Sequence, residues 1–202
     1  MNQKKQLINI NENPFILFDK WFSEAKEKEI NNPNAMNLAT VGKDFCPSSR
    51  IVLLKTYDKS GFVFYTNFNS RKGSDIKENP NVVLNFFWKS LLKQVRIEGV
   101  AESVSNQVAD NYFDSRSENS RLGAWASNQS SILSNRNELE KKVIEYKEKF
   151  KGKKITRPIY WSGFKIKPKL IEFWQEMPFR LHDRVEFIRS DDNNFVGRRL
   201  YP

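Results

Sequence analysis

The sequence predicts a mainly β protein, an antiparallel barrel with helices added around it. Segments rich in β-branched and aromatic residues recur along the chain, and short turns containing Asn, Asp, Gly or Pro separate them. Helical patterns are fewer and lie between groups of these segments. The chain has 202 residues, 39% of them hydrophobic, and contains no internal repeat and no linker. We therefore expect residues 1–202 to form a single domain.

The first 30 residues are predicted to form an N-terminal helical segment. Asn13 precedes Pro14, a pair typical of a helix N-terminus, and apolar residues then follow at helical spacing to about Ile30. Residues 31–34 end this pattern. The segments that follow are predicted to be strands, with a hairpin turn at Asp58–Gly61, and span Met36–Val41, Ser49–Tyr57 and Phe62–Thr66.

The second half of the chain mixes helices and strands. Ser70 is expected to begin a short helix that ends at Glu78, before Pro80. Further helices are predicted at Ser105–Ser115 and Arg136–Phe150. The remaining strands are expected at Val82–Trp88, Leu92–Val104, Trp161–Ile166, Leu170–Gln175, Val185–Ile188 and Phe195–Leu200.

Composition narrows the function classes. With 34 basic and 24 acidic residues the net charge is +10, which favours anionic partners such as phosphorylated small molecules, nucleic acid or membrane phosphates. No apolar run approaches the ~20 residues that span a bilayer, and the N-terminus lacks the apolar centre of a signal peptide. The single cysteine, Cys46, and single histidine, His182, argue against a disulfide and a transition-metal site. We expect a cytoplasmic protein without a metal.

The segment Arg50–Lys55 is an apolar strand with a cation at each end. Burying a charge is costly unless it is paired, so we expect Arg50 and Lys55 to face an anion or the mouth of the barrel. In a regular strand, residues five apart lie on opposite faces. The two cations would then serve two different anions, or one of them would simply be solvated.

Two further motifs carry polar side chains in a pattern that suits phosphate. Tyr65–Asn67 and then Ser70–Lys72 place hydroxyls and two cations where a strand ends and a helix begins, and a helix N-terminus favours anions. Gln94, Arg96 and Glu98 share one face of a strand. The alternative for this strand is a half-solvated surface with an Arg–Glu pair.

Tyr112, Arg116 and Ser120 recur at four-residue steps. If one helix continues through them, a phenol, a guanidinium and a hydroxyl line a single stripe, and all three suit phosphate oxygens. Residues 123–130 follow with small side chains and with amide and hydroxyl donors, including Gln129 and Ser130.

The C-terminal part holds Glu172–Gln175 and then Arg180–Arg184, which includes the only histidine. If residues 180–184 form a strand, Arg180, His182 and Arg184 share one face. Two guanidiniums and an imidazole on one face indicate an anionic or planar partner. A charged edge strand is the competing interpretation.

In their order along the chain, these motifs and the closing Arg199–Pro202 resemble the pyridoxine/pyridoxamine 5′-phosphate oxidase family, over about residues 34–202. The resemblance implies an FMN-binding split β-barrel, Greek-key-like with peripheral helices, that forms a homodimer. Both active sites would lie at the subunit interface, with residues 157–202 as dimerisation and active-site strands. The implied FMN contacts are Arg50, Ile51, Val52, Leu53, Leu54, Lys55, Tyr65, Thr66, Arg71, Lys72, Gln94, Gln129, Ser130, Trp174 and Arg184. The implied substrate contacts are Lys55, Tyr112, Arg116, Ser120, Arg180, Leu181 and His182, with Arg180 and His182 as catalytic residues over the pyridine ring.

The resemblance also implies an activity. Pyridoxamine 5′-phosphate and pyridoxine 5′-phosphate would be oxidised to pyridoxal 5′-phosphate, with O2 as electron acceptor and release of H2O2, and of NH3 from the amine. No nucleic-acid or membrane partner is expected. In this chain Glu176–Phe179 stands where the family commonly has a glycine, which leaves the substrate preference open.

Three other functions compete with this one. The first is a related FMN-dependent oxidase of the phenazine-pathway type, which acts on another heteroaromatic ring; an unphosphorylated substrate would not need the cluster Lys55, Tyr112, Arg116 and Ser120. The others are a non-catalytic flavin or haem carrier and a basic nucleic-acid-binding barrel. A nucleic-acid barrel would spread its cations along an exposed groove.

Overall fold

The computed structural model describes residues 6–192 and 194–202, so residues 1–5 of the predicted N-terminal segment lie outside it. The helices are α1 (Pro14–Lys28), α2 (Arg71–Glu78), α3 (Asn106–Asp114), α4 (Glu118–Ala126), α5 (Arg136–Lys149) and a 3-10 turn at Pro178–Arg180. The strands are β1 (Ala35–Val41), β2 (Pro47–Leu53), β3 (Thr56–Asp58), β4 (Gly61–Asn67), β5 (Asn81–Trp88), β6 (Lys93–Ser103), β7 (Trp161–Gln175), β8 (Asp183–Arg189) and β9 (Phe195–Leu200). The predicted mainly β, antiparallel architecture is confirmed.

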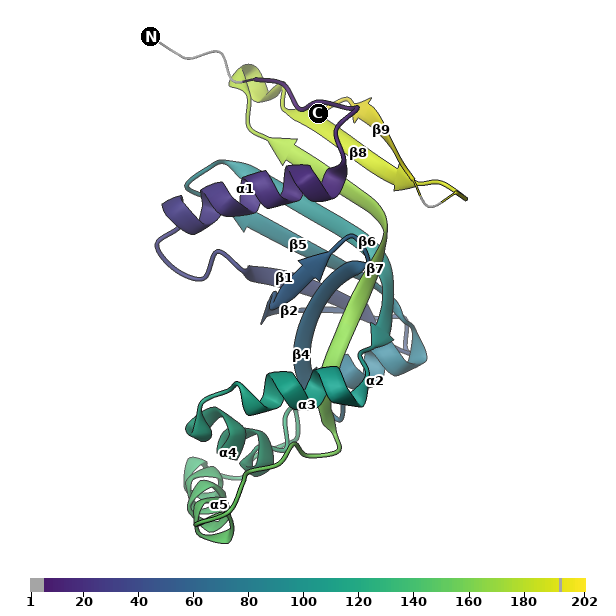
Figure 1. Cartoon of the computed structure of the whole chain (residues 1–202). Coiled ribbons are helices and arrows are strands. Elements are labelled where there is room, and N and C mark those ends of the chain that lie inside the picture. Colours follow the sequence, from purple (N-terminus) through teal and green to yellow (C-terminus); the bar gives the residue numbers. More distant parts are fainter. Residues whose placement is uncertain (1–5, 193) are drawn as a thin grey trace.

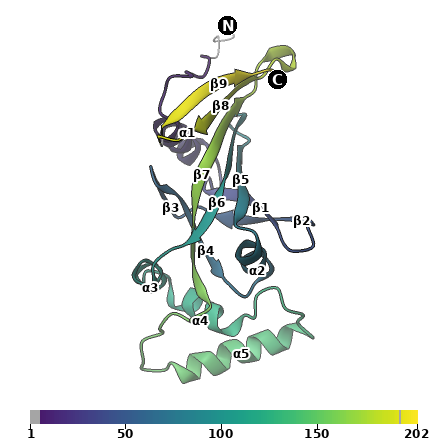
Figure 2. The ribbon, with the colours of Figure 1, turned by 90° about the vertical axis from the view of Figure 1, so that its right-hand side faces the viewer.

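The strands form one sheet that curls into a barrel (Figures 1 and 2). Its order is β2-β1-β5-β6-β7-β4-β3, and β8 and β9 extend it from β7. β2 and β3 are at opposite ends of this order, yet only Leu54 and Lys55 separate them in the chain. The two edges of the sheet must therefore approach each other, and the connection between them closes the barrel.

β7 is the long strand that links the two ends of the molecule. It pairs with β6 along its length, with β4 through its first part and with β8 through its last part. The prediction of two strands here is wrong, because β7 continues through Pro168. This proline pairs with Gly99 at a register shift in β6, and such irregular positions tolerate a residue without an N–H. A Cβ on Gly99 would lie 2.3 Å from the Lys167 carbonyl oxygen, so only glycine permits this approach.

The main core is aromatic and lies between the barrel and α1 (Figure 1). The Asn13 side chain caps α1 by accepting a hydrogen bond of 2.9 Å from the Phe15 N–H, as predicted. On the buried face of α1, the Phe18 ring meets Phe62 and Phe86 edge-on, with centroids 5.0 Å and 5.4 Å away. Aromatic side chains bury large apolar areas, so this contact fixes α1 on the barrel.

A second, smaller core lies beneath α3 and α4 and is built on Phe113, Leu122, Ile155 and Trp161. α4 was not predicted. The chain leaves α3 at Asp114, and α4 begins after Ser117, whose hydroxyl accepts a hydrogen bond from the Ser120 N–H. The condition that one helix continues through Tyr112, Arg116 and Ser120 is therefore not met.

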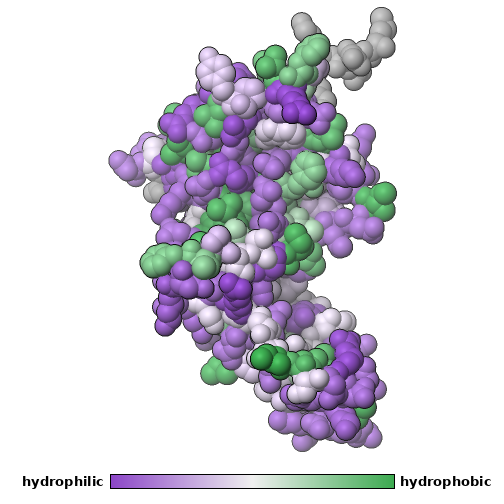
Figure 3. Space-filling view, turned by 180° about the vertical axis from the view of Figure 1, so that it is seen from behind, coloured by the Kyte–Doolittle hydropathy of each residue, from purple (hydrophilic) through white to green (hydrophobic). Residues whose placement is uncertain are grey.

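Seen from behind, the surface is mostly hydrophilic, with apolar side chains in small groups (Figure 3). Among the residues described, no helix has both the length and the apolar character required to cross a bilayer. The same residues contain no cluster of three or more His, Cys, Asp or Glu side chains that is suited to a metal ion.

Candidate active site

A cavity of about 980 Å³ opens between β2, the end of β4, the start of α2, and helices α3 and α4. Segments from distant parts of the sequence meet there. Most of the predicted site residues line it, namely Arg50, Ile51, Val52, Leu53, Lys55, Tyr65, Thr66, Arg71, Lys72, Tyr112, Arg116, Ser120, Gln129 and Ser130. Leu54 does not, because it is buried in the main core.

Arg50 and Lys55 both reach this cavity because the predicted strand Ser49–Tyr57 is interrupted. The Asn34 side chain donates a hydrogen bond of 2.9 Å to the Leu54 carbonyl, and the Lys55 N–H donates one of 2.9 Å to the Val63 carbonyl. The chain therefore passes from β2 to β3 between these bonds. The expectation that Arg50 and Lys55 lie on opposite faces of a regular strand is wrong for this reason.

Arg50 is held in place by neighbours that the sequence analysis did not single out. Its Nη1 donates to Thr40 Oγ1 at 2.6 Å and its Nη2 to Ser48 Oγ at 2.8 Å. Thr40 in turn donates to Asp75 Oδ2 at 2.7 Å. Burial lowers the pKa of Arg50, Asp75 opposes this effect, and Arg71 adds to it. Arg50 and Lys72 thus both interact with the single acid Asp75, and the cavity retains an excess of positive charge.

The start of α2 adds a second cation and free backbone donors. Ser70 occupies the N-cap, but its hydroxyl donates to the Asn67 carbonyl and accepts from Lys72 Nζ instead of bonding to the helix. The Lys72 side chain is buried, and burial together with Arg50 lowers its pKa. A helix N-terminus without a side-chain cap, beside partly desolvated cations, is suited to a phosphate group.

The opposite wall of the cavity carries a second set of donors. Arg116 lies over the Trp161 ring, with its guanidinium carbon 4.6 Å from the ring centroid. Among the residues described, its buried Nη1 has no hydrogen-bond partner, and burial lowers its pKa. Tyr112, on α3, stacks on Tyr65 with centroids 3.9 Å apart. Tyr112 on α3, Ser120 on α4 and Arg116 in the connection between these helices therefore reach the cavity together.

The remaining predicted residues lie elsewhere, in a row across the other end of the sheet. Gln94 on β6 pairs with Trp174 on β7, and Trp174 pairs with Arg184 on β8. We call Gln94, Trp174 and Arg184 the cross-strand row. The His182 ring lies against it, 4.7 Å from the Trp174 ring.

The helical end of the cavity and the cross-strand row lie at opposite ends of β7. Trp161, at the start of β7, lines the cavity, whereas Trp174 lies near the end of β7. A strand rises about 3.3 Å per residue, so roughly 40 Å of strand separates them. Figure 1 shows β7 running from the α3–α5 end of the molecule to β8 and β9. The predicted site residues therefore form two separate groups.

The segment before β8 differs from its prediction. Residues 178–180 form a 3-10 turn that begins at Pro178, and the strand starts only at Asp183. Phe179 and Arg180 have φ angles of 60° and 62°, which no regular strand contains. Arg180 consequently does not share a strand face with His182 and Arg184. His182 is oriented by the Met177 N–H, which donates to its Nδ1 at 3.3 Å.

Comparison with known proteins identifies the family. Residues 22–150 match the family described as pyridoxamine 5′-phosphate oxidase. The chain belongs to the pyridoxamine 5′-phosphate oxidase family. Residues 161–202 match the C-terminal dimerisation region of pyridoxine 5′-phosphate oxidase, so the cross-strand row includes Trp174 and Arg184 from that region.

Sequence relatives match this chain over almost its full length. A pyridoxine/pyridoxamine 5′-phosphate oxidase from Pelagibacter ubique is 47% identical over 100% of both chains. Another from Rhizobium meliloti is 52% identical over 94% of this chain and 92% of its own. The match to the Pelagibacter ubique protein therefore spans both the cavity segments and the C-terminal region of this chain.

Solved structures share the fold. PhzG from Burkholderia lata 383, in complex with tetrahydrophenazine-1-carboxylic acid, has a TM-score of 0.88 and 28% identity, and the match covers 94% of this chain and 93% of that one. A pyridoxamine 5′-phosphate oxidase-related, FMN-binding protein from Nostoc punctiforme has a TM-score of 0.75 at 14% identity, over 95% of this chain and 100% of that one. The second likeness concerns the fold alone, and the predicted split-barrel fold is confirmed.

Proposed function

We propose that this chain oxidises pyridoxamine 5′-phosphate and pyridoxine 5′-phosphate to pyridoxal 5′-phosphate, with bound FMN and with O2 as the electron acceptor. The observation that carries the proposal is that one cavity contains two separate sets of side chains able to donate hydrogen bonds to a phosphate. Arg50, Arg71 and Lys72 form one set, and the other consists of Lys55, Tyr112, Arg116 and Ser120. A flavin phosphate and a substrate phosphate would occupy them.

The residues present fit FMN. Arg50 and Lys72 have lowered pKa values because burial penalises their charge, and a phosphate would compensate both. The exposed apolar side chains of Ile51 and Leu53 border the same cavity and suit a flat ring. When bound, FMN supplies the redox chemistry by accepting two electrons from the substrate and passing them to O2.

The chain's own residues bind and orient the substrate. Arg116 offers the substrate phosphate a buried N–H that has no partner in the described part of the chain, and the stack of Tyr65 on Tyr112 fixes the phenol of Tyr112. A guanidinium is a hydrogen-bond donor and has no acceptor site for a proton. We therefore assign Arg180 an electrostatic role over the pyridine ring, with His182 beside it, and no role as a base.

We further propose that the active site is shared between two copies of the chain. The cross-strand row and Arg180 lie at the far end of β7 from Trp161 and the helical wall of the cavity, so a second copy would have to supply them to the first. The match of residues 161–202 to a dimerisation region supports this arrangement. A cytoplasmic location is part of the proposal and is supported by the single, free cysteine Cys46.

A related oxidase that acts on another heteroaromatic ring is the second candidate, and the likeness to PhzG favours considering it. The set of hydrogen-bond donors formed by Lys55, Tyr112, Arg116 and Ser120 favours a phosphorylated substrate instead. The test is H2O2 release by purified, FMN-loaded protein with pyridoxamine 5′-phosphate and with unphosphorylated pyridoxamine. We expect turnover of the phosphate ester and little of pyridoxamine. Equal turnover of both, or of neither, would contradict the proposal.

A further inference from the structure

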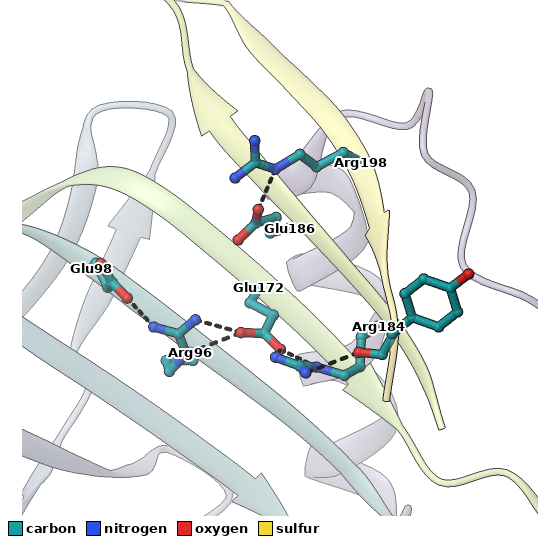
Figure 4. A network of polar contacts seen from close by, with 7 residues as sticks. Arg96, Glu98, Glu172, Arg184, Glu186 and Arg198 are labelled. Atoms are coloured by element: carbon teal, nitrogen blue, oxygen red, sulfur yellow. Dashed lines mark hydrogen bonds and ion pairs between the residues drawn. The ribbon is translucent and has the colours of Figure 1, made fainter. Parts of the chain in front are cut away.

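Glu172 is a buried carboxylate next to the cross-strand row. Its side chain is 3% exposed, and it lies on β7 between two arginines of the neighbouring strands, Arg96 on β6 and Arg184 on β8. Arg96 Nε donates to Glu172 Oε2 at 3.1 Å, and Arg184 Nε donates to Glu172 Oε1 at 2.8 Å. Figure 4 shows the carboxylate between the two guanidiniums. Each oxygen of Glu172 therefore holds a different arginine.

The contacts of Arg184 fix its guanidinium without using all its donors. Its Nε and Nη2 both lie 2.8 Å from Glu172 Oε1, and its Nη1 donates to the Tyr201 carbonyl at 3.1 Å. A guanidinium has five N–H donors. These contacts use three of them, and the side chain remains 30% exposed. Arg184 is thus held at a set position and keeps donors for a ligand.

A second acid, on the same face of the sheet as Glu172, provides a comparison. Glu186, on β8, pairs across the sheet with Glu172 in the strand register and is also buried. It binds Arg198, whose side chain is 64% exposed, on the outermost strand β9. Glu186 therefore pairs with Arg198, which is not part of the cross-strand row. Glu172 pairs with Arg184, which is part of it.

We propose that Glu172 is a positioning residue for the flavin site, acting through Arg184. The inference rests on the proposed function, with Arg184 as one of the residues that contact FMN. A charge-assisted hydrogen bond between planar groups sets both distance and direction, so Glu172 determines where the free donors of Arg184 point. Arg96, tied also to Glu98, holds the other oxygen and keeps the carboxylate from rotating.

The experiment is a double-mutant cycle on FMN affinity. Apo protein is titrated with FMN and the quenching of flavin fluorescence gives Kd for wild type, Glu172→Gln, Arg184→Gln and the double variant, with Glu186→Gln as the matched control. We expect Glu172→Gln to weaken FMN binding about tenfold, the effect of one charge-assisted contact. The Glu186→Gln control should bind like wild type. In the double variant the two losses should not add, because both remove the same contact.

Outcomes separate this inference from the proposed function. Glu172→Gln with wild-type affinity, or with a loss that adds fully to that of Arg184→Gln, would overturn the inference. If Glu172→Gln is not recovered as a folded dimer, Glu172→Asp, which keeps the charge but withdraws the carboxylate, replaces it in the cycle. Wild-type protein that binds FMN but oxidises neither phosphate ester would contradict the proposed function while the cycle still decides the role of Glu172. Wild type that binds no FMN would contradict both.

Discussion

Arg116 lies over the Trp161 ring, with its guanidinium carbon 4.6 Å from the ring centroid, and its buried Nη1 has no partner among the residues described. Buried polar groups in proteins are nearly always hydrogen-bonded. The stack therefore holds a charged donor ready for a ligand. This pair joins the helical end of the molecule to the start of β7, and it forms one wall of the cavity.

The first prediction concerns Arg116. Arg116→Ala should chiefly raise KM for pyridoxamine 5′-phosphate, by roughly ten- to a hundredfold for one charge-assisted contact, with kcat little changed. This is the mark of binding that is equal in ground and transition states. Steady-state kinetics measure it, and Arg136→Ala, an exposed arginine of α5, is the control. A fall in kcat with KM unchanged would contradict the role of substrate anchor.

The second prediction concerns the flavin phosphate. Lys72→Ala should weaken FMN binding by about 1.5–3 kcal/mol, roughly ten- to a hundredfold, and should slow turnover far less once FMN is saturating. Lys77→Ala, in the last turn of the same helix α2, should bind FMN as wild type does. Equal affinities for FMN in both variants would mean that the phosphate binds elsewhere.

The third prediction concerns pH. Burial, and then Arg50, lowers the pKa of Lys72 below its ordinary 10.5, whereas a phosphate beside it favours the charged form and raises that pKa. At pH values between the pKa of Lys72 in the FMN-free protein and its higher pKa in the FMN-bound protein, the FMN-bound protein holds more protons. FMN binding should therefore take up a proton there, and affinity should fall as pH rises.

Calorimetry in two buffers of different ionisation enthalpy measures this uptake. Lys72→Met, which has no titrating group at this position, is the control and should take up fewer protons at the same alkaline pH. Identical proton uptake by wild type and Lys72→Met would rule out Lys72 as the group that titrates.

The fourth prediction concerns the loop before β8. Phe179 is 93% exposed and has a φ angle of 60°, which costs an L-residue about 1–2 kcal/mol. Phe179→Gly should therefore be more stable than Phe179→Ala, which keeps the Cβ, by about 1 kcal/mol. Urea unfolding of the two variants gives the difference. Equal unfolding midpoints and slopes would show that the backbone at Phe179 is not strained.

Much of the fold and the cavity lining follows from local sequence. Asn13 and Pro14 specify the start of α1, and alternation of apolar residues specifies most strands. Cations inside apolar segments, such as Arg50, mark the cavity because burying an unpaired charge is unfavourable. These signals lie within a few residues of the positions they describe.

The remaining features depend on contacts between distant segments. Thr40 and Asp75 hold Arg50 from two other elements, and no local pattern distinguishes them from other polar residues. The interruption after Leu53 depends on Asn34. The 3-10 turn at Pro178–Arg180 gives Phe179 and Arg180 positive φ angles, which the sequence of residues 180–184 does not indicate. The separation of the cavity from the cross-strand row emerges only once β7 is seen as one strand.

We propose that two chains build each active site, and subunit complementation is the experiment that decides whether they do. Arg116→Ala alters the cavity, and Arg180→Ala alters the other end of the chain. The two variants are co-expressed with different tags, the mixed dimer is purified, and kcat/KM for pyridoxamine 5′-phosphate is compared with that of each parent.

If the cavity of one chain works with Arg180 of its partner, one site of each mixed dimer is free of both changes and the other site carries both. The mixed dimer should then recover about half of the wild-type kcat/KM per dimer, far above either parent. If each site were built within one chain, every site would carry one change. A mixed dimer no more active than the average of its parents would contradict the claim.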